Sequence, residues 1–558
     1  MAIGKAASHC TIKVYRYTIW HMTDQDEKIH LSQITQALLT SLDIKSPPNK
    51  TVEGENYHVS QTVSLFGFVY ERIRNAIEFN EEHLIRRIAI TRILRRRLAI
   101  NTSGDHEGEN LVRELLWGRY VPENHFSATD IQNIQHIIDR YIAFYRAIHT
   151  SLTAGKTIHL GAVITELLSC ALEEYISGSQ TQRESASLYF FYQTLRNKVN
   201  IPHVSDEARD EYFFVASERA LARNDNSSIL HHIMVLKYGD IVGLTDKELS
   251  RAASEFPTFL KRSYATIKNP YDDVLTRFAK KQVPPFKILY AILTEYSKDA
   301  SHILSNTSQL KKYVQTVCNL KYKQTSEKLR AAAVKSIIYI FLTKMLFVLI
   351  LEIPLSRLLL DHVDIIAITI NTFFPPVLMS IIVSVITPPS QSNTQRIYER
   401  IVDLIDKDPT YETQPIIITR SRTSQKPILF MFFSLLYLLT FSVVFGVIYS
   451  ALDAMGFNIV SKLIFIFFIS VVAFFGYRIR QTAKEYMLET QSNIITSAVT
   501  FLFLPILYLG KLLSDQVSRI NVFIIFFDYF IEAPFKFFID IVEEWARFLR
   551  DRKDELVN

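Results

Sequence analysis

Glycine is scarce in this chain, with 15 glycines among 558 residues. The few that occur do not form a G-x-G-x-x-G or another phosphate-cradling loop, which argues against a nucleotide-binding α/β domain. No serine stands in a G-x-S-x-G motif, and no cysteine has a recognisable catalytic neighbourhood. The sequence therefore favours helices and gives no sign of an enzyme or of a cofactor.

Cysteine is scarcer still. Cys10, Cys170 and Cys318 are far apart and form neither a C-x-x-C pair nor an evident disulfide framework. This usage suits a reducing compartment. The N-terminal 20 residues also lack an uninterrupted apolar core of signal-peptide length, so we expect the N-terminal domain to lie in the cytosol.

Side chains that could hold a metal are not grouped along the chain. His231 and His232 are adjacent but have no metal-ligating neighbour at helical spacing, which favours a core or surface pair over a zinc site. Glu173 and Glu174 point to different sides of a helix, unlike a general acid and base. The sequence therefore predicts no metal site.

Long apolar runs are present, but only after a break in composition near Ala331. The segment 428–451 carries no charge over 24 residues, more than the roughly 20 that cross a hydrocarbon core of about 30 Å. Four further candidate spans follow the break, and a sixth segment is ambiguous: 336–353, 363–386, 460–477, 494–509 and the ambiguous 522–541. We expect an all-α protein with five or six membrane spans.

The basic residues give an orientation. Of the 62 lysines and arginines, 42 precede Ala331. The loops after the second and fourth predicted spans are also rich in them, whereas the loops after the first and third are poor, and short cytoplasmic loops carry this excess. We therefore expect the N-terminal domain and the loop 387–427 on the cytosolic side of a plasma or inner membrane.

Four regions follow from these patterns. Residues 1–58 hold a possible short strand at 11–22 and a loop at 46–55, and 59–332 form a cytosolic helical domain that ends in a basic linker. Residues 333–513 form the membrane domain, and 514–558 form an amphipathic helix and tail. Apolar periodicity predicts helices at 131–148, 162–176, 208–223 and 287–296, and Thr245-Asp-Lys-Glu248 resembles a capping box.

Six arginines fall in the segment 85–97 but spread around the helix without forming a stripe. We expect them to pair with nearby glutamates, with anionic lipid and, more remotely, nucleic acid as alternatives. The glutamates in question are Glu71, Glu78, Glu81 and Glu82.

One lysine lies where a plain anchor would not need it. Lys344 sits near the middle of the first predicted span, where a lysine costs roughly 2.5–3.5 kcal/mol on insertion scales, so it should face protein or water. Pro375 and Pro376 of the second span cannot donate to the carbonyls of Asn371 and Thr372, which leaves two acceptors at the same depth. We expect Lys344 to donate to this broken turn.

Acidic residues follow at the outer end of the same spans. Glu352, Asp361 and Asp364 could form an acidic mouth. A transporter or channel would use this mouth as a cation entrance and Lys344 as a gate or coupling charge. In the alternative interpretation, Lys344 is a packing group and the acids lie in headgroup water.

A charged stripe marks the C-terminal segment. Asp528, Glu532, Lys536 and Asp540 recur every four residues, opposite an aromatic and apolar face. Such a helix lies in the membrane interface, spans the membrane with its stripe buried, or contacts another copy. The side of the C-terminus depends on which of these holds.

The sequence thus predicts an integral membrane protein whose cytosolic helical domain has a non-enzymatic scaffold, anchoring or partner-binding role. Its partners would be the lipid bilayer and a protein or a second copy, and nucleic acid is not favoured. The alternative is a transporter or channel regulated by the N-terminal domain. A membrane enzyme acting on lipid has only the amphipathic helix in its favour.

Overall fold

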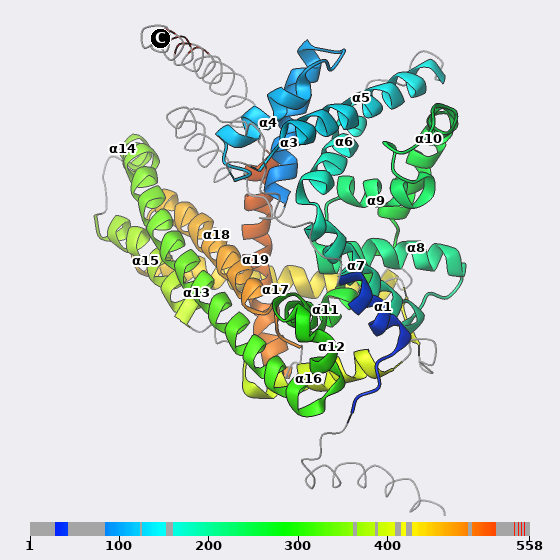
Figure 1. The fold of residues 1–558 in the computed structure, drawn as a ribbon. Coiled ribbons are helices and arrows are strands. Elements are labelled where there is room, and N and C mark those ends of the chain that lie inside the picture. The colour runs from blue at the N-terminus through cyan, green and yellow to red at the C-terminus, as the bar shows by residue number, and fades with distance from the viewer. Residues whose placement is uncertain are drawn as a thin grey trace, which may run out of the picture.

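The computed structural model describes residues 28–42, 84–122, 125–151, 160–360, 365–384, 389–407, 415–419, 427–488 and 494–519, and single residues of the C-terminal segment. This part is helical almost throughout, which confirms the all-α prediction (Figure 1). Its one strand pair is short: β1 (Val199–Asn200) lies parallel to β2 (Ile416–Ile417). The strand expected at 11–22 lies outside the described residues.

The N-terminal unit, the described part of residues 28–322, contains two hydrophobic cores. The first core is formed mainly by six helices whose apolar faces meet around Leu115, Ile138 and Phe256. These helices are α3 (Ile85–Ile100), α4 (Glu107–Trp117), α5 (Ala128–Ser151), α6 (Leu160–Ser177), α9 (Asn226–Tyr238) and α10 (Asp246–Ile267).

The second core gathers helices that are far apart in the sequence around Phe191, Phe286 and Ile401. Its members are α1 (Gln33–Leu42), α7 (Ser179–Leu195), α8 (Asp206–Ser217), the π-helix η3 (Glu218–Ala222), α11 (Asp272–Glu295), α12 (Ala300–Ser305), the start of α13 (Thr307–Phe347) and α16 (Gln391–Asp406). The short 3-10 turns η2 (Arg196–Lys198) and η4 (Ser297–Asp299) connect them. Because α16 comes from the predicted loop 387–427, this described stretch of the loop is part of a folded core.

Local sequence signals explain several helix starts. Thr245 accepts a hydrogen bond from the backbone of Glu248, whose side chain accepts one from the backbone of Thr245, so the predicted capping box of α10 is confirmed. Ser127 and Asp130 make the same reciprocal pair at the start of α5. Such caps satisfy backbone N–H groups that a helix start leaves without partners.

The arginines of α3 find their partners on other helices. Arg86 binds Glu173 of α6 through two hydrogen bonds, and Arg96 and Arg97 both bind the buried Glu114 of α4. The glutamates expected as partners lie outside the described residues. The arginines nevertheless serve the internal packing of the N-terminal unit.

The apolar bundle is formed by the second half of α13 and the helices that follow. These are the π-helix η5 (Val348–Glu352), α14 (Ile353–Leu360), α15 (Ile365–Ser384), α17 (Pro427–Ala454), α18 (Ile459–Ala483) and α19 (Ile494–Arg519). Helices α13, α15 and α18 pack side by side (Figure 1). Four described segments are long and apolar enough to cross a membrane: Thr307–Leu358, Ile365–Ser384, Phe430–Ala454 and Ile459–Ala483.

This supports an integral membrane protein, and the count of five or six spans stays a prediction. In α19 the apolar part found is shorter, Phe501–Leu513. The ambiguous segment 522–541 lies almost entirely outside the described residues.

Helix α13 joins the two halves without an interruption. It has 41 residues, about 60 Å at 1.5 Å per residue. Its beginning packs Leu310 and Val314 into the second core, and its later part packs Ile340 against Met379 and Val472 of the bundle. The basic stretch 321–330, expected as a linker, is helical.

A buried asparagine fixes two segments on the N-terminal unit. These inter-span segments are the described residues 389–407 after α15 and 484–488 after α18. Nδ2 of Asn393 in α16 donates to Oη of Tyr322 in α13 and to the carbonyl of Tyr486, both at 2.8 Å. Its Oδ1 accepts from the backbone N–H of Leu488 at 2.9 Å. The segments after α15 and after α18 therefore meet the N-terminal unit on one side of the bundle.

Candidate functional sites

A buried charge cluster lies inside the apolar bundle. Nζ of Lys344 is 3.3 Å from Oε2 of Glu352, and both side chains are fully buried. Nζ also lies 4.5 Å from the ring centroid of Phe468, a favourable cation–π distance. The lysine is therefore compensated within the protein and does not face lipid.

Two more helices hold the carboxylate of Glu352. Nδ2 of Asn371 in α15 donates to Oε1 at 2.7 Å, and Oγ of Ser461 in α18 donates to the same oxygen at 2.9 Å. Ser461 stands in the first turn of α18, where the positive end of the helix dipole favours an anion. The cluster thus ties α13, η5, α15 and α18 together at one point.

The π-helix η5 accounts for the meeting of Lys344 and Glu352. In an uninterrupted α-helix of 3.6 residues per turn, position 352 lies about 80° around the axis from position 344. A π-turn reaches one residue further before it closes, so it takes up the surplus residue and brings Glu352 back toward the face of Lys344. Pro354 follows at once and cannot donate to the carbonyl of Ile350, which favours an irregular turn here.

The predicted intramembrane site is only partly assembled. Lys344 donates to Glu352, and the expected bond to the turn before the prolines is replaced by this ion pair. Thr372 donates to the carbonyl of Ile368 within its own helix. Pro375 and Pro376 are buried while α15 continues through them, so they shape the helix without ligating the lysine.

The acidic mouth is not shown. Glu352, assigned to it by sequence, is instead the buried partner of Lys344. Asp361 and Asp364 lie outside the described residues, as do Asp528, Glu532, Lys536 and Asp540 of the C-terminal stripe.

A second candidate site is a large basic cavity between the N-terminal unit and the inter-span segments. Its volume is about 2070 Å³. Ten basic side chains line it: Arg219, Arg223, Arg277, Lys280, Lys281, Lys287, Arg396, Arg400, Arg478 and Lys484. Five acidic ones oppose them: Asp272, Asp273, Glu399, Asp403 and Glu485.

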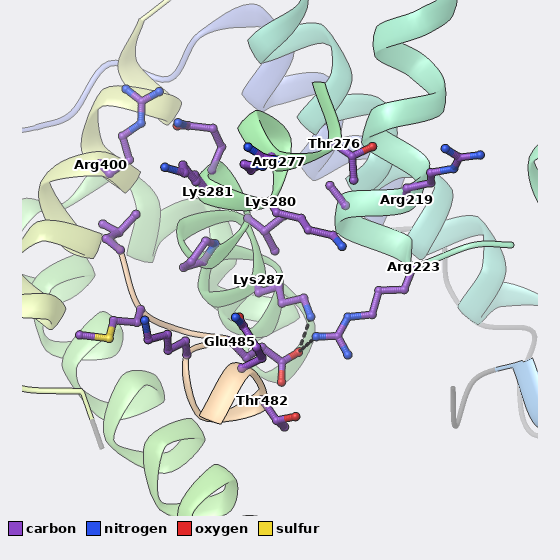
Figure 2. A pocket seen from close by; sticks show the side chains of 18 of the residues that line it. Arg219, Arg223, Thr276, Arg277, Lys280, Lys281, Lys287, Arg400, Thr482 and Glu485 are labelled. Carbon is purple, nitrogen blue, oxygen red and sulfur yellow. Dashed lines mark hydrogen bonds and ion pairs between the residues drawn. The ribbon is translucent and has the colours of Figure 1, made fainter. Parts of the chain in front are cut away.

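Part of this positive charge is paired. Nζ of Lys287 and Nη2 of Arg223 lie 2.6 Å and 3.0 Å from Oε1 of Glu485, and Figure 2 shows the two cations meeting at this carboxylate. Burial by itself would raise the pKa of Glu485, but the charges of Lys287 and Arg223 outweigh it and lower the pKa below its ordinary value. Arg219 pairs with Asp272.

The remaining positive charge determines which kind of ligand the cavity suits. Among the described residues, no ion pair is formed by Arg277, Lys280 or Lys484, and all three side chains are exposed. Concave walls of one sign concentrate the electric potential and attract ions of the other sign. The cavity is therefore suited to an anion with several charges.

The basic cavity lies beside the apolar bundle. Tyr477 and Arg478, near the end of α18, line the cavity, and so do Arg396 and Arg400 of α16, the helix that follows α15. Tyrosine and basic residues gather where membrane helices meet water. In the sequence these basic residues indicate only the orientation of the spans. The residues of α11 come next to them only in the folded protein, so the sequence alone does not indicate a shared cavity.

No protein-family model matches the chain, and neither a curated protein nor a solved structure shows significant similarity to it.

Proposed function

We propose that this protein is a non-enzymatic membrane scaffold that binds the phosphate-bearing headgroup of an anionic lipid in its basic cavity. In this proposal the N-terminal unit lies in the cytosol, the four apolar helices cross the membrane, and the cavity lies at the cytosolic surface. The observation that carries it is the excess of basic over acidic side chains in a cavity lined by the end of α18.

The two inter-span segments support this orientation. Both pack against the N-terminal unit through Asn393, and both carry the basic residues typical of short cytoplasmic loops. The cytoplasmic leaflet also holds the anionic lipids that attract such residues. The same distribution of basic residues therefore supports both the cytosolic orientation and the anionic ligand.

The shape of the cavity favours a headgroup over a small metabolite. At about 2070 Å³ it exceeds the roughly 300–1,000 Å³ of small-molecule pockets. A headgroup with several phosphates, still attached to its acyl chains in the membrane, would reach the walls from α11, α16 and α18 together. A protein partner or a second copy of the chain is the alternative occupant.

The test uses the full chain in nanodiscs of phosphatidylcholine, with and without a phosphoinositide. The variant is Arg277→Gln/Lys280→Gln, and the matched control is Lys247→Gln/Lys261→Gln on the exposed face of α10. At about 1 kcal/mol per basic residue, the double variant should bind the phosphoinositide about 30-fold more weakly, and the control should bind like the wild type.

A second measurement with a soluble polyphosphate distinguishes a lipid headgroup from a free phosphate compound. Inositol hexakisphosphate that binds as tightly as the lipid would show that the cavity takes a free polyphosphate. Equal lipid binding by wild type and Arg277→Gln/Lys280→Gln would overturn the proposal and leave a protein partner as the occupant to test.

Transport is the second candidate, because of the Lys344–Glu352 pair. Intramembrane ionisable residues often mark ion or proton pathways. Against this, both side chains are fully buried, which favours a structural pair. Proton or cation flux into liposomes that is lost in Lys344→Met would establish transport, whereas flux no greater than in protein-free liposomes would exclude it for those ions.

A further inference from the structure

Three side chains from two helices of the first core converge on one point. Oε1 of Glu174 in α6 lies 3.2 Å from Nδ1 of His231 and 3.2 Å from Nε2 of His232, both in α9. The ligand atoms of the three residues all lie within 4.8 Å of one another. The sequence did not reveal a metal-ligating neighbour for the two histidines, because this neighbour, Glu174, belongs to another helix.

These separations fit a metal ion. With bonds of about 2.0–2.2 Å to nitrogen and oxygen in a tetrahedral arrangement, ligand atoms stand about 3.4 Å apart. Two imidazoles and one carboxylate are a ligand set that suits zinc. The cluster therefore matches zinc in ligand type, and its two glutamate–histidine separations of 3.2 Å are close to the tetrahedral spacing.

One buried atom points to a ligand independently of this spacing. His231 is 2% exposed, and its Nδ1 makes no hydrogen bond among the described residues although Glu174 is close. A buried nitrogen without a hydrogen bond costs free energy. Coordination of an ion would satisfy it, since the lone pair would then point at the ion and not at the neighbouring ligand.

The outer partners hold the rings as metal sites require. Nδ1 of His232 lies 2.7 Å from Oε1 of the fully buried Glu218 in η3, and Oε2 of Glu218 accepts from Nδ2 of Asn224 at 2.6 Å. Nε2 of His231 lies 3.3 Å from Oη of Tyr141. Histidine ligands commonly donate their second N–H to a carboxylate or another oxygen, which leaves the first nitrogen free to bind the metal.

An entry path is present as well. Glu174 and His232 line a cavity of about 810 Å³. An ion can enter from this side, and water can occupy the fourth position. We propose that Glu174, His231 and His232 bind a divalent transition-metal ion of the zinc class, with Glu218 and Tyr141 orienting the two rings.

The test measures zinc bound to the purified full chain in detergent, after chelation and retitration. The ligand variant is Glu174→Gln, because Glu174 is partly exposed and the change preserves its size. The orienting variant is Glu218→Gln, and the control is His136→Gln, an exposed histidine of α5. Cobalt(II) absorption reports coordination directly, because tetrahedral sites give intense visible bands.

We expect one zinc per chain and a zinc-dependent rise in the melting temperature for the wild type and His136→Gln. Glu174→Gln should lose both, and Glu218→Gln should bind zinc about 10- to 100-fold more weakly. Should Glu174→Gln fail to fold, the chelator-dependent shift of the wild type decides. Less than one tenth of an equivalent of zinc in the wild type, or equal binding in Glu174→Gln, overturns the proposal in favour of an ion pair between the histidines and glutamates.

Discussion

Nζ of Lys344 and Oε2 of Glu352 lie 3.3 Å apart, and neither side chain is exposed. A buried pair of this kind contributes little net stability compared with apolar residues, but the loss of one partner leaves a buried charge without compensation. The pair is important because of where it lies. Asn371 of α15 and Ser461 of α18 both donate to the carboxylate of Glu352, so two further helices meet at the pair. The pair therefore specifies how the bundle helices align.

A double-mutant cycle tests this coupling. Lys344→Met or Glu352→Gln alone should lower the free energy of unfolding by about 3–5 kcal/mol, because each leaves one buried charge. The double variant should be less destabilised than either single one, since Gln still accepts from Asn371 and Ser461. Unfolding in mixed micelles with increasing SDS measures all four proteins, and strictly additive losses would show that the pair does not interact.

Asn393 is the corresponding link between the halves. Asn393→Ala should leave the backbone carbonyl of Tyr486 and the N–H of Leu488, which belong to half-buried residues, without their partner. We expect a cost of about 0.5–1.5 kcal/mol for each lost hydrogen bond. We expect faster proteolysis of the segment after α18. Gln395→Ala, on the exposed face of the same helix, is the control, and equal cleavage of both variants would contradict this role.

The ion pairs of Glu485 predict a pH dependence. Because the pKa of Glu485 is lowered in the folded protein, its contribution is complete above the ordinary value of 4.5 and is lost as the pH falls through the folded-state pKa. Glu485→Gln should cost about 1.5–3 kcal/mol at pH 7 and should reduce the difference in stability between pH 7 and pH 3.

The control for this prediction is Glu255→Gln, which breaks an exposed pair with Arg251 worth only about 0.3–0.5 kcal/mol. An unchanged pH dependence in Glu485→Gln would mean that Lys287 and Arg223 are not held by this carboxylate.

Close packing of α18 and α19 depends on a missing side chain. A Cβ at Gly510 would overlap the carbonyl oxygen of Ser470 and lie 2.7 Å from Cβ of Phe474. Gly510→Ala should therefore destabilise the bundle by about 1–3 kcal/mol. Gly446→Ala in α17 should be neutral or stabilising, because nothing beyond its chain neighbours and the backbone of its own helix lies within 4 Å of the added Cβ. Melting temperatures in detergent compare the two, and equal values would contradict the tight contact.

Local patterns were sufficient for much of the helical layout. The uncharged segment 428–451 falls within Pro427–Ala454, and 162–176 falls within Leu160–Ser177. The helix predicted at 287–296 is only the end of α11, which begins at Asp272 and continues through Pro284 and Pro285. Tertiary packing tolerates these prolines inside a helix, and a local rule that ends helices at proline cannot anticipate it.

The sites depend on relations that periodicity does not contain. The partner of Lys344 was missed because Glu352 reaches it only through the π-turn of η5. The neighbour of His231 and His232 was missed because Glu174 belongs to a different helix. The basic cavity combines α11 with segments about 120 and 200 residues further along the chain. Each of these needs the fold before its chemistry can be recognised.

The most direct measurement is photo-crosslinking of the full chain in nanodiscs with a phosphoinositide that carries a photoreactive group beside its headgroup, followed by peptide mapping. The proposed function predicts crosslinks in α11, in α16 and at the end of α18, and their loss in Arg277→Gln/Lys280→Gln. Crosslinks found only outside these three segments, or unchanged in the variant, would contradict binding of a lipid headgroup in the basic cavity.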